Sequence, residues 1–358
     1  MFEAWRRVEK QMRDGRDVRR RGRELRRAGR MHAGELSRIG VGTGDFLRDR
    51  AAPVVVSVVR DEMLRLPFFL DHHRSLGFAG FLIVDNASTD GTTEFLARQR
   101  DVVLHTTSAS YAAATTGVDW QQHLIREFAL ERWALIADAD EQLVFPGDRE
   151  EGIRALIARA EASGDEAVMA PLVDVYPAVP LRDAIYRSGQ TFLSVADRFD
   201  GPESHYLRAV RQRGRTRHVE VRGGVRLRTM DFALAEAPLL TKFPFARRRR
   251  RVAVESAHLL HPPAMNRTST FAALLHFKYF HDFAARAEWG ASSGEHWHDG
   301  YEYRKYRRAI ERNPSIGFVY EGSRRYRGPD SLDWLWNGIR CVQASGASDF
   351  VRANDLGP

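Results

Sequence analysis

Short runs of apolar residues, many of them β-branched, alternate from Pro53 onward with longer stretches in which apolar residues recur at helical spacing. Runs of this length are typical of strands that are buried on both faces. The pattern predicts strands at 53–59, 81–85, 102–107 and 133–138. Helices are expected between them, at 61–77, 86–99 and 117–131.

An alternation of strands and helices with short loops predicts right-handed crossovers and a mainly parallel sheet flanked by helices. Such sheets bind their ligands beyond the carboxyl ends of the strands. Three of these ends carry clusters of polar residues: RDE at 60–62, DNASTD at 85–90 and DADE at 138–141. We therefore expect all three clusters to open onto one crevice.

The pattern becomes mixed after residue 150. Strands are expected at 166–177, 206–211, 224–230 and 253–262, and helices at 149–163, 269–288 and 298–312. No internal repeat and no long linker is visible. Residues 51–340 are therefore expected to form one α/β domain with a mixed α+β C-terminal half, followed by a tail at 341–358.

The first 50 residues differ from the rest in charge. They hold 15 Lys and Arg against 8 Asp and Glu, whereas the remaining 308 residues hold 40 against 39. Phe2, Trp5, Val8 and Met12 recur at helical spacing, so an amphipathic helix is expected over 2–13. Two interpretations of 1–50 stay open: a solvated basic arm, or a segment that lies on an anionic membrane. No nucleic-acid recognition motif accompanies it.

Composition excludes several classes of site. A single cysteine, Cys341, rules out intrachain disulfides and cysteine-based zinc clusters. No apolar run reaches the roughly 20 residues of a membrane span, and the N-terminus lacks the apolar core of a secretory signal. Neither a G-x-G-x-x-G nor a G-x-x-x-x-G-K-[ST] motif is present, which disfavours a dinucleotide dehydrogenase and a P-loop enzyme.

The acids at 138–141 carry the strongest chemical signal. Residues two apart in a strand share a face, so Asp138 and Asp140 are expected to present both carboxylates to one point where the sheet ends. Crowded carboxylates repel one another unless a cation neutralises them, and Mn²⁺ and Mg²⁺ prefer oxygen ligands. A metal site is therefore expected, with an acid cluster satisfied by neighbouring arginines as the alternative. Asp90 has a second interpretation too, as the N-cap of the following helix.

Taken together, these motifs resemble the GT-A glycosyltransferases, specifically the family 2-like group. The motifs that carry the resemblance are RDE, DNASTDGT and DADE, at the ends of the first, second and fourth predicted strands. In the C-terminal half they are LTKFPF (240–245), AHLLHP (257–262), LLHFKYFHDF (274–283), YEYRKY (301–306) and YEGSRRYRGPDSLDWLWNGI (320–339). This half looks like bacterial family 2-type enzymes without membrane spans and is also similar to family 92-like enzymes. The resemblance covers about 53–340.

The resemblance implies a GT-A fold with a nucleotide-binding half at 51–147 and an acceptor-binding half at 148–340. It also implies roles for single residues. Asp138 and Asp140 would bind the metal and the donor diphosphate, with Glu141 in support. A histidine would complete the metal site, with His258 as first choice and His261 or His276 in reserve. The residues expected to bind the nucleotide-sugar are Arg60, Asp61, Glu62, Asp85, Asn86, Asp90, Gln122, Asp138, Lys242 and Lys278.

An inverting transfer also needs a base that takes the proton of the acceptor hydroxyl. Asp174 in PLVDVYP is the expected catalytic residue, with Asp282 and Glu220 as competitors. A retaining transfer needs no such base, and the stereochemistry stays open. The run ARRRRR (246–251) is interpreted either as a solvated loop or as a binding site for an acidic acceptor.

The expected function is therefore metal-dependent transfer of a sugar from a nucleotide-diphosphate donor, with a UDP-sugar expected, to a glycan, lipid-linked or surface polysaccharide acceptor. Mn²⁺ or Mg²⁺ would be the cofactor. We expect a cytoplasmic enzyme, peripheral on the inner membrane face through residues 1–50, with no specific nucleic-acid partner. The alternatives are a nucleotidyltransferase and a non-catalytic glycan- or nucleic-acid-binding protein on the same fold.

Overall fold

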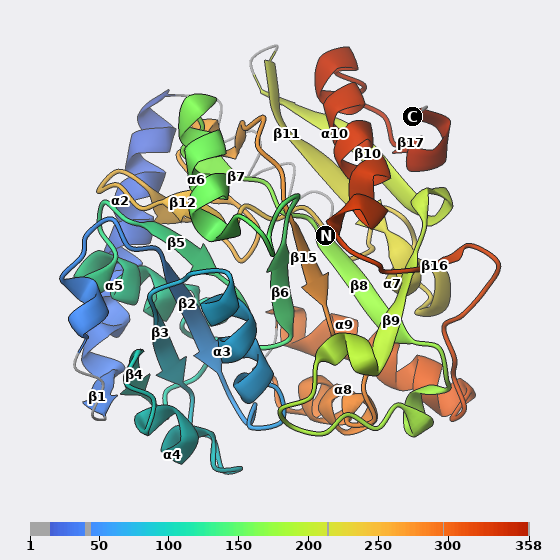
Figure 1. The fold of residues 1–358 in the computed structure, drawn as a ribbon, viewed down its shortest axis with the longest axis horizontal. Helices are drawn as coiled ribbons and strands as arrows, with labels where there is room; N and C mark the ends of the chain where they lie inside the picture. The colour runs from blue at the N-terminus through green and yellow to red at the C-terminus, as the bar shows by residue number, and fades with distance from the viewer. Residues whose placement is uncertain (1–14, 40–43, 213–214, 296, 357–358) are drawn as a thin grey trace.

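The fold is built around a seven-stranded sheet, seen in the computed structural model of residues 15–39, 44–212, 215–295 and 297–356 (Figure 1). Its strand order is β1 (Ser37–Ile39), β4 (Val102–Thr106), β3 (Gly80–Asp85), β2 (Val54–Val59), β5 (Trp133–Ile136), β12 (Phe245–Arg247) and β7 (Ala167–Val168). Strands β2, β3, β4 and β5 are mutually parallel, and β7 shares their direction because it and β5 both pair antiparallel with β12. The predicted mainly parallel sheet is confirmed.

Helices cover both faces of this sheet, which explains why its strands are apolar on both sides. Val55 and Val59 face α3 (Leu66–Ser75), α4 (Thr92–Ala97) and α6 (Gly152–Ala162) in one core cluster. Val54 and Val56 point the other way, toward α5 (Val118–Phe128), in a second cluster. Alternate residues of β2 thus enter different cores, as the pleat of a strand requires.

A second sheet adjoins the first and has the order β16 (Ser323–Arg325), β9 (Ala196–Asp200), β8 (Leu172–Pro177), β15 (Ala273–His276) and β6 (Glu141–Val144). Strand β6 follows β5 after a four-residue turn, so the acids of DADE lie where the chain passes from one sheet to the other. Strand β15 is parallel to β8 and antiparallel to β6.

The remaining elements surround these two sheets. Strands β11 (Arg215–Gly223), β10 (His205–Gln212) and β17 (Val351–Arg352) form a small sheet, and β13 (Ala253–Val254) pairs with β14 (Leu260–His261). The other helices are α2 (Gly15–Met31), α7 (Gly224–Thr229), α8 (Phe283–Ser292), α9 (Trp297–Arg312) and α10 (Asp333–Ser345). Single 3₁₀ turns lie at 32–35, 45–47, 181–183, 192–194, 202–204, 263–266, 329–332 and 353–356.

Three predicted elements differ from the structure. Residues 224–230, expected as a strand, form α7, because Gly223 and Gly224 take φ angles of 124° and 70° and turn the chain sharply out of β11. The helix expected over 269–288 is β15 followed by α8, and the strand expected over 253–262 is the hairpin of β13 and β14. In the first two cases short apolar runs fitted both the helix and the strand period.

The described part of the basic N-terminal segment packs against the domain. Helix α2 lies beside α5, as Figure 1 shows at the left of the molecule. The close approach is made by Gly29 of α2 against the side chain of Gln122, and Arg126 of α5 donates a hydrogen bond to the carbonyl of Arg26. The helix expected over 2–13 falls outside the described residues. Among the described residues, no helix has both the length and the apolar character that crossing a bilayer demands.

Candidate functional site

Asp138 and Asp140 lie in the turn between β5 and β6, and Glu141 is the first residue of β6. Strand β5 ends at Ile136, so the two-residue period that would align Asp138 with Asp140 does not apply. The side chain of Asp138 is 54% exposed, whereas Asp140 and Glu141 are buried. The backbone N–H of Asp138 donates to Glu141 Oε2 at 3.1 Å, which closes the turn. The expectation of two aligned carboxylates is therefore corrected to one exposed and one buried acid.

Three chemically active residues lie side by side across the second sheet. His276 of β15 is in register with Glu141 of β6 on one side and with Asp174 of β8 on the other. Residues directly opposite each other in neighbouring strands project from the same face of a sheet. The register of β15 therefore brings one imidazole between two carboxylates that are far from it in sequence.

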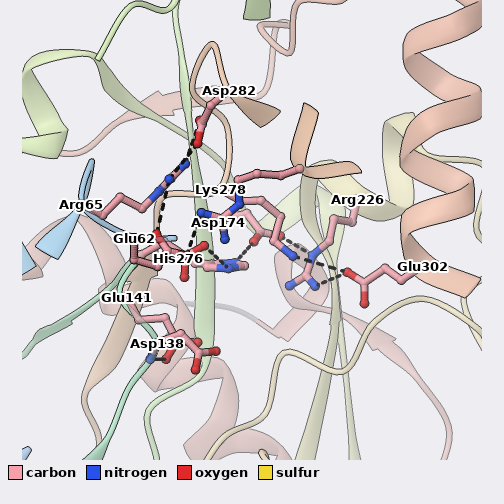
Figure 2. Close-up of polar contacts among 12 residues, drawn as sticks. Glu62, Arg65, Asp138, Glu141, Asp174, Arg226, His276, Lys278, Asp282 and Glu302 are labelled. Atoms are coloured by element: carbon pink, nitrogen blue, oxygen red, sulfur yellow. Dashed lines mark hydrogen bonds and ion pairs between the residues drawn. The ribbon is translucent and has the colours of Figure 1, made fainter. Parts of the chain in front are cut away.

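His276 also links Asp174 to Asp140. Its Nδ1 lies 2.7 Å from Asp174 Oδ1, and its Nε2 faces Asp140 Oδ2 at 3.6 Å (Figure 2). Burial opposes the charged form of His276, but Asp140 and Asp174 raise its pKa to about 9. In return, although burial opposes it, His276 holds the pKa of Asp140 well below its usual range. The three side chains form one coupled unit.

Both carboxylate oxygens of Asp174 are hydrogen-bonded. Its second carboxylate oxygen accepts a hydrogen bond from Arg226 Nε at 2.7 Å, and both side chains are almost completely buried. Although burial opposes it, Arg226 and His276 hold the pKa of Asp174 below its usual range. A general base must be free to take a proton near neutral pH, and a buried carboxylate paired on both oxygens does not meet that requirement.

The competing candidates for the base are paired with arginines as well. Asp282 accepts two hydrogen bonds of 2.8 Å from Arg65, and Glu220 contacts Arg208 at 2.6 Å and Arg222 at 2.5 Å. The catalytic role expected of Asp174 stays a prediction, and both oxygens of this carboxylate are paired, with Arg226 and with His276. Neither competitor is better placed to act as the base.

Two lysines lie at opposite ends of the acid cluster. Lys242 Nζ donates to both carboxylate oxygens of Glu141, at 2.6 and 2.7 Å, and lies 4.0 Å from Asp138. Lys278 lies 3.9 Å from Glu302 Oε1, beyond hydrogen-bond distance, and stands over the ring of Tyr303. Lys242 therefore neutralises a buried acid, whereas the ammonium of Lys278 keeps capacity for an anion.

Further charges close the site from the side of α3 and α8. Glu62, at the end of the RDE cluster, lies 2.8 Å from Arg286 and 3.5 Å from Arg65. Burial raises the pKa of Glu62, an effect that Arg286 and Arg65 oppose. Glu302 of α9 binds Arg226 at 3.1 Å. Nearly every acid of the cluster thus has a protein cation beside it, as the alternative of an arginine-satisfied acid cluster expected.

Most polar residues expected to bind the nucleotide lie at the carboxyl ends of β2 and β3. Hydrogen bonds join the loop after β2 to the loop after β3. Asp61 accepts a hydrogen bond from the backbone of Thr89, and Asp90 accepts one from the backbone of Met63. Asp85 accepts hydrogen bonds from the hydroxyls of Ser88 and Thr93, and Asn86 donates to the carbonyls of Thr107 and Ala109. Arg60 stacks on the exposed ring of Trp289. The polar residues that follow β2 and β3 thus already have partners within the protein.

Three other candidates have partners other than the acids of the turn. Gln122 accepts a hydrogen bond from the backbone of Val254 and packs against Gly29 of α2. His258 is hydrogen-bonded to the carbonyl of Thr241, and burial lowers its pKa to about 4. His261 packs against Gly22 of α2. The reserve candidate His276, and not His258 or His261, is the histidine beside Asp140.

The donor atoms of Asp140 and His276 suit a divalent cation that displaces the proton from Nε2 of His276, since only a neutral imidazole binds a metal. A separation of 3.6 Å is too long for a hydrogen bond but matches two ligands of one metal ion, whose own bonds are about 2.1 Å. Histidine ligands usually donate their other ring nitrogen to a carboxylate, as His276 does to Asp174. Among the described residues, no group of three such side chains already converges on one point. The pair fits a metal, and Asp138 on the same turn offers a further, exposed carboxylate.

Sequence reasoning missed the arginines of the site and Glu302. Arg226 was hidden in the expected strand at 224–230, Arg65 directly precedes α3, and Arg286 lies in α8 without any motif around it. Glu302 belongs to YEYRKY, a tract that the family resemblance includes but to which it assigns no role. Only the packing of α7, α8 and α9 around the turn reveals these residues.

Comparison with known proteins identifies no family. No protein-family model matches the chain, and no curated protein matches it. Among solved structures, a UDP-glucose pyrophosphorylase from Acinetobacter baumanii matches with a TM-score of 0.33 and 11% identity, over 72% of this chain and 98% of that one. A putative glucose-1-phosphate thymidylyltransferase from Bacillus anthracis, in complex with a sucrose, matches with a TM-score of 0.27 and 9% identity, over 85% and 99%. Likeness at this level says nothing about the reaction.

Proposed function

We propose that the chain is a metal-dependent glycosyltransferase that moves a sugar from a nucleotide-diphosphate donor to a glycan, lipid-linked or surface polysaccharide acceptor. One observation carries the proposal. At the turn that ends β5, Asp140 and His276 face each other at 3.6 Å, and Asp174 holds the imidazole in that orientation. The turn lies beyond the carboxyl ends of parallel strands, where sheets of this kind bind ligands.

In this proposal Asp140 and His276 hold a Mn²⁺ or Mg²⁺ ion, and the exposed carboxylate of Asp138 supplies a further oxygen. When bound, the ion offsets the negative charge that develops on the departing diphosphate. Asp174 keeps the Nε2 atom of His276 aimed at Asp140 through its bond to Nδ1. Glu141 closes the turn that carries Asp138, and Lys242 compensates the buried charge of Glu141.

Lys278 is assigned to the diphosphate of the donor. It follows His276 by two residues, and its ammonium has no hydrogen-bonded carboxylate within the described part of the chain. A nearby fixed cation stabilises a leaving nucleotide without reorganising. Arg60, Asp85 and Asn86 lie at the carboxyl ends of β2 and β3, on the same edge of the sheet as the turn after β5, so they are retained as residues of the nucleotide side. No residue is assigned as the base.

Donor binding with and without Mn²⁺ tests the proposal directly. UDP-, GDP- and dTDP-sugars and CMP-sugars would be titrated into the wild type, Asp140→Ala and His276→Ala, with heat as the readout. Metal-dependent binding of one nucleotide-sugar, lost in both variants, supports the proposal. Gln122→Ala, on the other side of the sheet, is the matched control and should bind as the wild type does. A folded wild type that binds no donor contradicts the proposal.

Product analysis separates the main alternative. A nucleotidyltransferase would form a nucleotide-sugar from a nucleoside triphosphate and a sugar phosphate and release pyrophosphate. A glycosyltransferase would release the nucleoside diphosphate, or the monophosphate from a CMP donor. The loop that follows β2, residues 60–65, contains no glycine, unlike the glycine-rich phosphate loop expected of a nucleotidyltransferase. Pyrophosphate as the product would replace the proposed reaction by the alternative.

A further inference from the structure

The outer face of α2 is a continuous row of arginines. Val18, Gly22, Leu25 and Gly29 recur every three or four residues and form the side of the helix that is turned toward the domain. Arg19, Arg20, Arg23, Arg27 and Arg30 fall elsewhere on the helix and are exposed. Arg20 has an acidic neighbour in Glu24, at 3.7 Å. For Arg23, Arg27 and Arg30, no ion pair is found within the described ranges.

A second basic segment lies against this helix although it is more than 200 residues away in sequence. Arg26 donates a hydrogen bond to the carbonyl of Arg251, and the side chains of Arg250 and Arg251 are exposed. Most of the ARRRRR run serves the fold, since Arg247 binds Glu161, Arg249 and Arg251 bind Glu166, and Arg248 is buried. The residues of the run that remain for binding an anion are Arg250 and, in part, Arg251, which is exposed but shares Glu166 with Arg249.

Arg126 of α5 joins the same patch. It donates to the carbonyl of Arg26, and burial, followed by the like charges of Arg30 and Arg26, lowers the pKa of its guanidinium. Cations of α5 and α2 therefore repel one another here. An anionic surface placed against the patch would relieve that repulsion.

We propose that this basic face, made of the exposed arginines of α2 with Arg126, Arg250 and Arg251, docks the protein on an anionic phospholipid bilayer. Apolar exposure at the end of the helix favours a bilayer over a nucleic acid. Met31 is 70% exposed and Ile39 is 41% exposed, and they are two of the six exposed large hydrophobic side chains among the described residues. A bilayer interface takes up apolar side chains beside the basic groups that bind its phosphates, whereas a nucleic-acid backbone offers them no apolar phase.

The inference does not depend on the proposed function. It uses no residue of the acid cluster, and the buried side of α2 packs on α5 and β13, not on the second sheet. It extends the expectation of a membrane contact through residues 1–50, because the surface is assembled by folding and includes residues near 250. A linear basic arm would bind without them.

Vesicle flotation of the full chain tests the proposal, with phosphatidylcholine vesicles that do or do not contain phosphatidylglycerol. Arg23→Gln/Arg27→Gln/Arg30→Gln should lower the partition coefficient about 100-fold, since each arginine near an anionic surface contributes about a fivefold effect. Arg250→Gln/Arg251→Gln should lower it by about tenfold to 30-fold. The matched control, Arg182→Gln/Arg308→Gln/Arg327→Gln, removes the same charge from exposed positions outside this face and should stay within about twofold of the wild type.

Met31→Asn distinguishes a bilayer from a nucleic acid. It should weaken vesicle binding and leave any binding to a duplex DNA unchanged. Equal losses in the α2 triple variant and in the control triple variant overturn the proposal, because they would reflect net charge alone. The proposal is also overturned if phosphatidylglycerol does not increase the binding of the wild type to vesicles. A third contrary result is that the wild type binds duplex DNA more tightly than vesicles and the same variants lose affinity for the DNA.

Discussion

His276 and Asp174 are joined by a 2.7 Å contact between Nδ1 and Oδ1 that follows from strand register, since the two residues are direct partners on parallel strands β15 and β8. The contact leaves Nε2 of the imidazole facing Asp140 at 3.6 Å. Because Arg226 holds the other oxygen of Asp174, the carboxylate cannot turn away without breaking a buried ion pair. The orientation of His276 is therefore determined from two strands and one helix.

Asp174→Asn should weaken Mn²⁺ binding about 10- to 100-fold, because the amide no longer compensates charge on a metal-bound imidazole. Mn²⁺ affinity measured by electron paramagnetic resonance reads this effect without any turnover. Glu302→Gln, which also removes a partner of Arg226 but does not touch His276, is the control and should keep Mn²⁺ affinity near that of the wild type.

The same variants decide between two roles for Asp174. If Asp174 were the base, Asp174→Asn would bind Mn²⁺ and donor normally and lose only the transfer step. Absence of Mn²⁺ binding to the wild type would instead remove the metal from the proposed function. Each outcome can be recognised because metal binding, donor binding and turnover are measured separately.

The ion pair of Lys242 with Glu141 gives a prediction about stability. Lys242→Met should lower the free energy of unfolding by about 3–5 kcal/mol, because it leaves the carboxylate of Glu141 buried and unpaired. The double variant Glu141→Gln/Lys242→Met removes both charges and should recover a large part of that loss. Urea denaturation at neutral pH measures both. A single variant as stable as the wild type would show that Glu141 carries no charge in the folded protein.

The first half of the fold could be predicted because its physical determinants are local. The runs that form β2, β3, β4 and β5 are apolar on both faces, and β-branched residues are dense in β2. Residues 269–288 were predicted as one helix because their apolar residues also fit a helical period. Burial of β15 between β6 and β8 overrides that period. Local spacing cannot show which strands will flank a segment.

The acids of the turn could be predicted from the sequence, but His276 and the arginines that accompany them could not. Asp138, Asp140 and Glu141 stand together in sequence, so crowding of charge is visible there. His276 lies more than 130 residues away, and only the register of β15 selects it over His258 and His261. The cations Arg226 and Arg286 come from helices whose positions depend on tertiary packing. Charge neutralisation in a buried cluster is a property of the fold, not of a motif.

Gly223 gives a prediction about the turn that delivers Arg226. Its φ of 124° and the 2.1 Å that would separate an added Cβ from the carbonyl oxygen of Ser204 leave no room for a side chain. Gly223→Ala should lower the free energy of unfolding by about 2–4 kcal/mol. Gly189→Ala is the control for backbone conformation alone, since φ is 85° there but nothing lies within 4 Å of the added Cβ. It should cost about 1–2 kcal/mol in a thermal or urea melt.

His218 predicts how stability depends on pH. It is buried on β11, and burial, followed by the charges of Arg217 and Arg208, lowers its pKa to about 3. Its value in the unfolded chain is about 6.5, so between these two values the unfolded chain binds more protons. The contribution of neutral His218 is therefore complete above pH 6.5 and declines as the pH falls toward 3. At pH 5 the free energy of unfolding should therefore be lower by about 2 kcal/mol than it is above pH 6.5.

His218→Phe removes this titration and keeps an aromatic ring against Phe243. Urea denaturation at pH 7 and at pH 5 should show a fall in the free energy of unfolding that is about 2 kcal/mol smaller in the variant than in the wild type. The difference arises between the two pH values, so an overall change in packing stability, equal at both, does not imitate it. An identical fall in both proteins would mean that His218 accepts a proton in the folded state as readily as in the unfolded chain.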